Sequence, residues 1–200
     1  MKKLLLAVLC IFALCAMSVA ADDDDKNTFH ATLRGINETP GPVATQATGS
    51  FQATLSADGT TLSYTVTYNN LNAPITQSHI HFGLSKETGG VMVFLCQTAA
   101  APAPATDLGV QTCPAGTSGT VSGTITVANV VGPNAQGITP AADFDKVIQA
   151  IREGASYANV HSTRSPGGEI RGVVHVGDGD RDDRHHGHDR DHDGDHDHHR

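Results

Sequence analysis

The stretch Phe51-Gln52-Ala53-Thr54-Leu55 alternates apolar and polar residues, and Thr61-Leu62-Ser63-Tyr64-Thr65-Val66-Thr67-Tyr68 resumes the same alternation. Between them, Ala57-Asp58-Gly59-Thr60 has the composition of a tight turn. A period of two places every second side chain on the same face of a strand. The stretch therefore predicts an antiparallel β-hairpin with one face in a core and the other in solvent.

Other segments with similar alternation predict further strands, each bounded by Gly, Pro, Asn or Asp. They are Thr28 to Arg34, Gln77 to Phe82, Val91 to Cys96, Gly119 to Val127, Tyr157 to His161 and Glu169 to Val176. Several short strands of this kind are typical of an all-β sandwich or barrel.

One segment has a helical pattern instead. Thr139-Pro140 resembles an N-cap followed by proline at the first helical position. Apolar residues then recur at helical spacing, and Gly154 can end the segment; these residues are Phe144, Val147, Ile148 and Ile151. We expect one short helix over the sheet, with Asp143 and Asp145 as capping or solvated charges.

The composition divides the chain into four parts. Residues 1–20 have the form of a secretory signal peptide: a basic start, an apolar run and the small residues Ser18-Val19-Ala20. Residues 21–26 are an acidic spacer, either natural or an engineered protease site, and residues 27–176 are long enough for one domain. Residues 177–200 contain no apolar residue and should form a disordered tail. We expect a secreted or periplasmic protein with no membrane span after cleavage, the alternative being an uncleaved N-terminal anchor.

Two cysteines, Cys96 and Cys113, would remain after cleavage. In an oxidising compartment an even count favours a disulfide, which here would close a loop rich in Ala, Pro and Thr. The alternative is a pair of thiol metal ligands.

Three ordered segments resemble the CHRD domain, the repeat unit of chordin that also occurs singly in exported microbial proteins. Phe29-His30-Ala31-Thr32-Leu33 precedes Gly35 and Glu38, the middle carries Ser78-His79-Ile80-His81-Phe82-Gly83, and Tyr157-Ala158-Asn159-Val160-His161-Ser162 leads into Pro166-Gly167-Gly168-Glu169-Ile170-Arg171-Gly172. The resemblance implies a Greek-key β-sandwich or barrel. It implies no activity; in chordin the repeats belong to a protein that binds secreted growth factors.

His79 and His81 lie two apart, so on a strand both imidazoles point to one face. With His161 from another strand, they could hold copper or zinc through three neutral nitrogens. Glu169 and Arg171 are candidates for supporting these ligands, or else form a partly buried ion pair. The alternative is that all three histidines are structural, half-buried residues whose rings bond backbone carbonyls or the Glu169/Arg171 pair. His30 and His175 are interpreted as isolated structural residues.

A weaker resemblance is to copper/zinc superoxide dismutase. His79-Ile80-His81 matches its His-x-His strand, Val160-His161 its later Val-His, and the segment from Gly167 to Gly172 its last turn. The His-rich zinc loop and a bridging histidine have no counterpart here, so dismutase activity is the third hypothesis.

The tail predicts loose binding of transition metals through seven histidines: His185, His186, His188, His192, His196, His198 and His199. Its alternatives are a calcium loop beginning at Asp189, whose twelfth position is Arg200 rather than Glu, and a purely solubilising role.

No nucleophile constellation or phosphate-binding glycine motif appears, and the net charge of −8 disfavours nucleic-acid binding. The sequence therefore predicts an exported, non-catalytic protein that binds copper or zinc. The alternative is a metal-free module that binds an extracellular protein or matrix partner.

Overall fold

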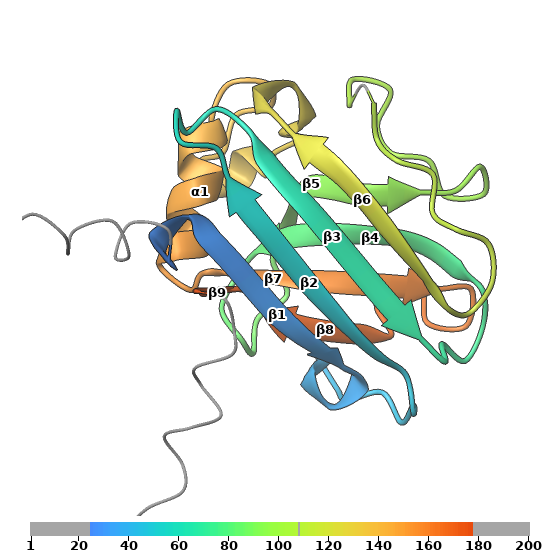
Figure 1. Ribbon diagram of the computed structural model, residues 1–200. Coiled ribbons are helices and arrows are strands. Elements are labelled where there is room, and N and C mark those ends of the chain that lie inside the picture. The colour runs from blue at the N-terminus through green and yellow to red at the C-terminus, as the bar shows by residue number, and fades with distance from the viewer. Residues whose placement is uncertain (1–24, 108, 178–200) are drawn as a thin grey trace, which may run out of the picture.

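The computed structural model describes residues 25–107 and 109–177. The predicted signal peptide lies outside the described residues, as does the predicted metal-binding tail from residue 178 onward. Within the described residues, nine strands form one antiparallel sheet that bends into two facing layers (Figure 1). This confirms the predicted all-β class.

The strands follow the order β5-β4-β7-β8-β1-β2-β3-β6, and β9 pairs with β1. One layer holds β1, β2, β3 and β6, and the other holds β4, β5, β7 and β8 (Figure 1). The bounds are β1 Thr28–Arg34, β2 Thr48–Leu55, β3 Leu62–Asn69, β4 Ile75–Phe82, β5 Gly90–Gln97, β6 Gly119–Ile125, β7 Ser156–Ser162, β8 Ile170–Val173 and β9 His175–Val176. Four short 3-10 turns lie outside the strands: η1 Asp25–Asn27, η2 Gly35–Asn37, η3 Val127–Asn129 and η4 Asn134–Gln136.

The predicted hairpin is confirmed as β2 and β3, which pair from Thr48↔Asn69 to Leu55↔Leu62. Alternate residues of both strands are buried, so their side chains fill the space between the layers. At the turn, Gly59 has a φ of +71°, and the Asp58 carboxylate accepts hydrogen bonds from the backbone N–H and hydroxyl of Thr60. The turn residues therefore fix the register that buries the apolar face.

Two predicted strands are shorter than their alternation indicated. The segment from Glu169 to Val176 is divided into β8 and β9, because the N–H of Val174 bonds Ser156 while the chain after it pairs with β1. The segment from Gly119 ends at Ile125, since the Thr126 side chain caps η3.

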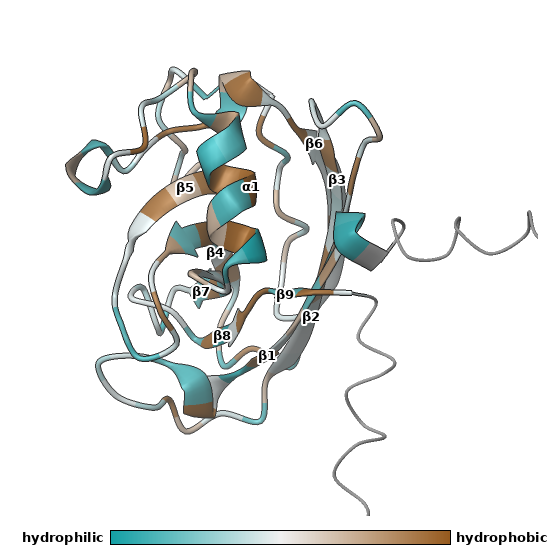
Figure 2. Cartoon of the chain, turned by 90° about the vertical axis from the view of Figure 1, so that its left-hand side faces the viewer, coloured by the Kyte–Doolittle hydropathy of each residue, from teal (hydrophilic) through white to brown (hydrophobic). Residues whose placement is uncertain are grey.

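The helix α1 spans Phe144–Arg152 and lies across one end of the two layers (Figure 2). Its four predicted apolar residues are buried, and Gly154, with a φ of +68°, follows its end. The predicted start at Thr139 is wrong. Residue Ala141 has a φ of +52°, which interrupts helical geometry, so the first turn forms only after Asp143. No helix among the described residues is long and apolar enough to cross a membrane.

Cys96, on β5, and Cys113, in the following loop, form the predicted disulfide. Hydrogen bonds from the Cys113 N–H to Gln97 and from the Gln97 N–H to Gln111 hold the returning chain against β5. The disulfide thus fixes the end of the long connection between β5 and β6 beside the layer that carries the site described below.

Replacing both cysteines by alanine should lower the free energy of unfolding by about 2–3 kcal/mol, since the sequence separation is 17 residues and the unfolded chain regains that loop's freedom. Urea denaturation of the oxidised protein and of the double variant measures the difference. Equal midpoints and slopes for the two proteins would contradict this expectation.

Candidate metal centre

The strand β7 is buried along its whole length, on both faces. Its core face carries Ala158 and Val160, which join the hydrophobic core between the layers. The opposite face of β4, β7 and β8, here called the covered face, carries polar residues: His79, His81, Tyr157, Asn159, His161 and Arg171. It is shielded by the segments 35–47, 83–89 and 163–169, each joined to it by hydrogen bonds.

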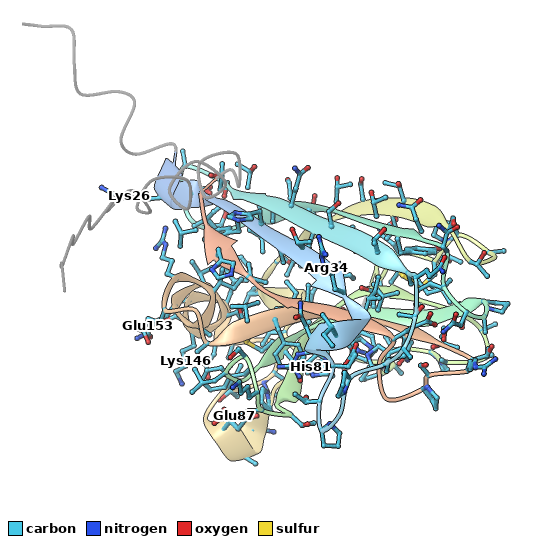
Figure 3. The ribbon with its side chains drawn as sticks, turned by 90° about the horizontal axis from the view of Figure 1, so that it is seen from below. Lys26, Arg34, His81, Glu87, Lys146 and Glu153 are labelled. Carbon is cyan, nitrogen blue, oxygen red and sulfur yellow. A yellow bond between two sulfur atoms is a disulfide. The ribbon has the colours of Figure 1, made fainter. Side chains whose placement is uncertain are left out.

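His79, His81 and His161 converge on this covered face. Each offers a ring nitrogen, and these atoms all lie within 4.8 Å of one another. The exposed fractions of the three residues are 4, 9 and 7%, respectively. Figure 3 shows His81 within the fold, whereas Glu87, Lys146 and Glu153 lie at its periphery. The residues predicted as metal ligands therefore form one buried group, hereafter the histidine triad.

Hydrogen bonds fix which ring nitrogens carry protons. Nδ1 of His81 lies 3.0 Å from the carbonyl oxygen of Gly89, and Nδ1 of His161 lies 3.0 Å from that of Pro166. A carbonyl oxygen only accepts, so both Nδ1 atoms are donors. In the neutral rings, Nε2 of each then holds a lone pair. This is how metal-binding histidines are commonly oriented.

The third ring completes the arrangement. Nδ1 of His79 lies 3.1 Å from Nε2 of His161; because that Nε2 holds a lone pair, Nδ1 of His79 is the donor and its own Nε2 holds a lone pair. An ion bound to Nε2 of His161 would replace this hydrogen bond. The Nε2 atoms of His79 and His81 are buried and have no hydrogen-bond partner among the described residues. One nitrogen each of His81 and His161 thus bonds a backbone carbonyl, as expected if the histidines are structural. This arrangement leaves buried nitrogens on His79 and His81 unsatisfied, which costs about 1–3 kcal/mol for each group.

Burial keeps the triad in its neutral, metal-binding form. The pKa of His79 lies well below its usual range because burial disfavours the charged ring, and His161 and His81 add to this effect. Burial likewise lowers the pKa of His81 to about 4 and that of His161 below its ordinary value. At neutral pH, metal ions would therefore meet no competing protons on these rings.

Aromatic rings enclose two of the histidines. Tyr157 stacks flat on His81 with centroids 4.7 Å apart, and the Phe94 ring meets His79 edge-on at 4.4 Å. The pairing of β4 with β5 is irregular at Ser78/His79 and again at Ile80/His81. Bulges of this kind re-aim side chains at functional sites.

Arg171 continues the stack on the far side of Tyr157, with its guanidinium carbon 3.5 Å from the ring centroid. It donates hydrogen bonds to the carbonyl oxygens of Leu84 and Ser85 and to the Thr39 hydroxyl. Arg171 is therefore linked to the triad through the Tyr157 ring, which stacks on His81.

Glu169 has a separate set of partners. Its carboxylate accepts hydrogen bonds from the Asn72 N–H, the Thr45 hydroxyl and the Ser162 hydroxyl. The Glu169–Arg171 ion pair considered from the sequence is not among the salt bridges of the described residues. Ser162 directly follows His161, so Glu169 braces the end of β7. Its supporting role for the metal ligands stays a prediction.

His30 and His175 are not isolated, contrary to the sequence interpretation. They face each other across β1 and β9, with ring centroids 5.6 Å apart, and Nδ1 of His30 lies 2.9 Å from the Gly177 carbonyl. Both line a cavity of about 580 Å³ that also borders Arg171 and Glu38. Burial raises the pKa of Glu38 to about 7. Sequence reasoning missed this pairing because it depends on β9 joining β1.

One comparison with known proteins identifies the family of this chain. The model of the CHRD domain family matches residues 29–174, which include every strand residue from Phe29 through β8 and the whole histidine triad. No curated protein and no solved structure matches the chain. Because the family model spans most of the sequence, the chain belongs to the CHRD domain family.

Proposed function

We propose that this CHRD domain binds one transition-metal ion, copper or zinc, through His79, His81 and His161. The observation that carries the proposal is the convergence of three neutral ring nitrogens in a buried place, with the Nε2 atoms of His79 and His81 lacking any described partner. A bound ion would satisfy these nitrogens and offset the cost of burying them.

The chemistry of the group favours these metals. Imidazole nitrogens suit copper and zinc, whereas calcium and magnesium prefer oxygen ligands. The hydrogen bonds of His81 to Gly89 and of His161 to Pro166 would keep the Nε2 lone pairs directed inward. We propose a binding role rather than a catalytic one.

We further propose that the protein works outside the cytoplasm. The signal-like residues 1–20 support export, and so does the Cys96–Cys113 disulfide, because such bonds persist in oxidising compartments. The histidines of the tail would add weaker metal binding in the same compartment.

The test is the metal content of the full chain purified without metal-affinity resin. After loading with copper or zinc, dialysis against a moderate chelator removes ions held weakly by the tail, and elemental analysis measures the remainder. We expect one ion per chain in the wild type. His79→Ala should weaken binding by more than about 100-fold, because it removes a ligand rather than a residue that orients one.

His175→Ala is the matched control, since it removes an exposed histidine outside the triad. It should retain the ion. Circular dichroism establishes that both variants fold. A folded wild-type domain that retains no ion, or equal retention by His79→Ala, would refute the metal site and leave the interaction module as the better hypothesis.

A further inference from the structure

We infer that the histidine triad prefers copper(I) to zinc(II). This inference rests on the metal site proposed above and concerns which ion that site selects. Imidazole alone does not distinguish the two metals strongly. The charge and the surroundings of the site distinguish copper(I) from zinc(II).

The triad supplies no negative charge. Among the described residues, the group that can converge on one ion contains only histidines, with no carboxylate or thiolate. An ion bound there would keep its full charge inside a site whose three residues are at most 9% exposed. The cost of burying an ion grows with the square of its charge, so a divalent ion is penalised much more than a monovalent one.

Nearby carboxylates are engaged elsewhere. Glu169 accepts hydrogen bonds from Asn72, Thr45 and Ser162, and Glu38 accepts one of 2.7 Å from the Asn159 amide. Neither belongs to the group of converging ligands. A divalent ion would therefore have no negatively charged ligand to neutralise its charge.

A buried positive charge also lies next to the triad. Arg171 is 2% exposed and lies over Tyr157, whose other neighbour in the stack is His81. Its guanidinium is held by neutral partners: the carbonyl groups of Leu84 and Ser85 and the hydroxyl of Thr39. Repulsion by this cation is proportional to the charge of the bound ion, so it disfavours zinc(II) more than copper(I).

Coordination number acts in the same direction. Zinc(II) on three histidines completes a tetrahedron with water or an anion. Copper(I) commonly binds with only two or three nitrogen ligands. Phe94 and the face of the Tyr157 ring lie against His79 and His81, and these aromatic surfaces offer no ligand atom for a fourth coordination position.

Competition titrations of the full chain test the preference. Copper(I), kept reduced by ascorbate and buffered by bicinchoninate, is titrated anaerobically; zinc(II), buffered by nitrilotriacetate, is titrated separately. His79→Ala gives the contribution of the tail in each case. We expect the triad to hold copper(I) at least about 100-fold more tightly than zinc(II).

The outcomes separate this inference from the function on which it rests. Zinc binding equal to or tighter than copper binding, lost in His79→Ala, would leave the proposed metal site standing and overturn the preference. Binding of neither ion above the His79→Ala level would overturn both.

A second pair of variants isolates the charge. Arg171→Met keeps a long side chain over Tyr157 and removes the cation, whereas Arg171→Lys keeps the cation without the planar guanidinium. Removing the charge should narrow the gap between copper(I) and zinc(II) by about tenfold, and the lysine variant should preserve it. An unchanged difference between copper(I) and zinc(II) affinity in a folded Arg171→Met protein would contradict the role of the Arg171 charge. If the variant fails to fold, the competition titrations of the wild type decide the preference.

Discussion

Replacing Glu169 by alanine is expected to lower the free energy of unfolding by about 3–4 kcal/mol, the largest loss we expect from removing a single hydrogen-bonding side chain of this domain. Glu169 is 0% exposed, and its carboxylate accepts hydrogen bonds from Asn72, Thr45 and Ser162. Alanine would leave a cavity and deprive all three donors of their acceptor. The Ser162 hydroxyl is fully buried and has the least access to replacement by water.

Glu169→Gln is the matched variant. Its amide oxygen can still accept from Asn72 and Thr45, and its amide nitrogen can donate to the Ser162 hydroxyl, which both donates and accepts. We therefore expect glutamine to recover most of the loss. Urea denaturation followed by circular dichroism measures all three proteins. An alanine variant as stable as the glutamine variant would show that the hydrogen bonds of Glu169 contribute little.

Removing the Glu169 carboxylate should also loosen the position of His161 in the histidine triad. Glu169 joins the start of β8 to Ser162 at the end of β7, and the loop between them carries Pro166, the hydrogen-bond partner of His161. This connection gives a physical reason for one sequence motif. Gly168, with a φ of +128°, has Asn159 and Glu38 close to where a Cβ would lie. The segment Pro166-Gly167-Gly168-Glu169 therefore closes the covered face.

The fold was largely predictable because period-two alternation reports which face of a strand is buried. The hairpin of β2 and β3 needed only local information: alternation on both sides of Asp58-Gly59. The start of α1 was not predictable from Thr139-Pro140, since the positive φ of Ala141 belongs to a turn that the fold imposes. The division of β8 from β9 likewise depends on which neighbours the chain finds.

The candidate metal site was predictable only in part. Spacing alone places His79 and His81 on one face, and the motif containing His161 lies on the strand that pairs with theirs. The atoms that orient the rings were not predictable, because they are carbonyl groups of Gly89 and Pro166 in loops without periodicity. Nothing in the sequence pairs Tyr157 with His81 either, since their contact follows from the register of β4 and β7.

Gly89→Ala is expected to cost about 3–5 kcal/mol of stability and to weaken metal binding by about 10–100-fold. A Cβ at residue 89 would lie 1.7 Å from the carbonyl oxygen of Phe82, so the backbone itself must move. Gly89 supports the site through both of its backbone groups: its N–H donates to the Tyr157 hydroxyl at 3.1 Å, and its carbonyl accepts from Nδ1 of His81. Shifting residue 89 would therefore weaken its hydrogen bond to the Tyr157 hydroxyl. It would also weaken the hydrogen bond that keeps the proton of His81 on Nδ1.

Gly41→Ala is the control, because it lies in another covering segment and has no atom near its would-be Cβ. It should match the wild type in urea denaturation and in the competition titrations. Tyr157→Phe separates the hydrogen bond of the Gly89 N–H from that of the Gly89 carbonyl. It removes the hydroxyl that accepts from the N–H but keeps the ring stacked on His81. If the carbonyl of Gly89 is what orients His81, Tyr157→Phe should lose stability and retain most of its metal affinity. Wild-type metal affinity in Gly89→Ala would instead show that His81 is held by the Tyr157 stack alone.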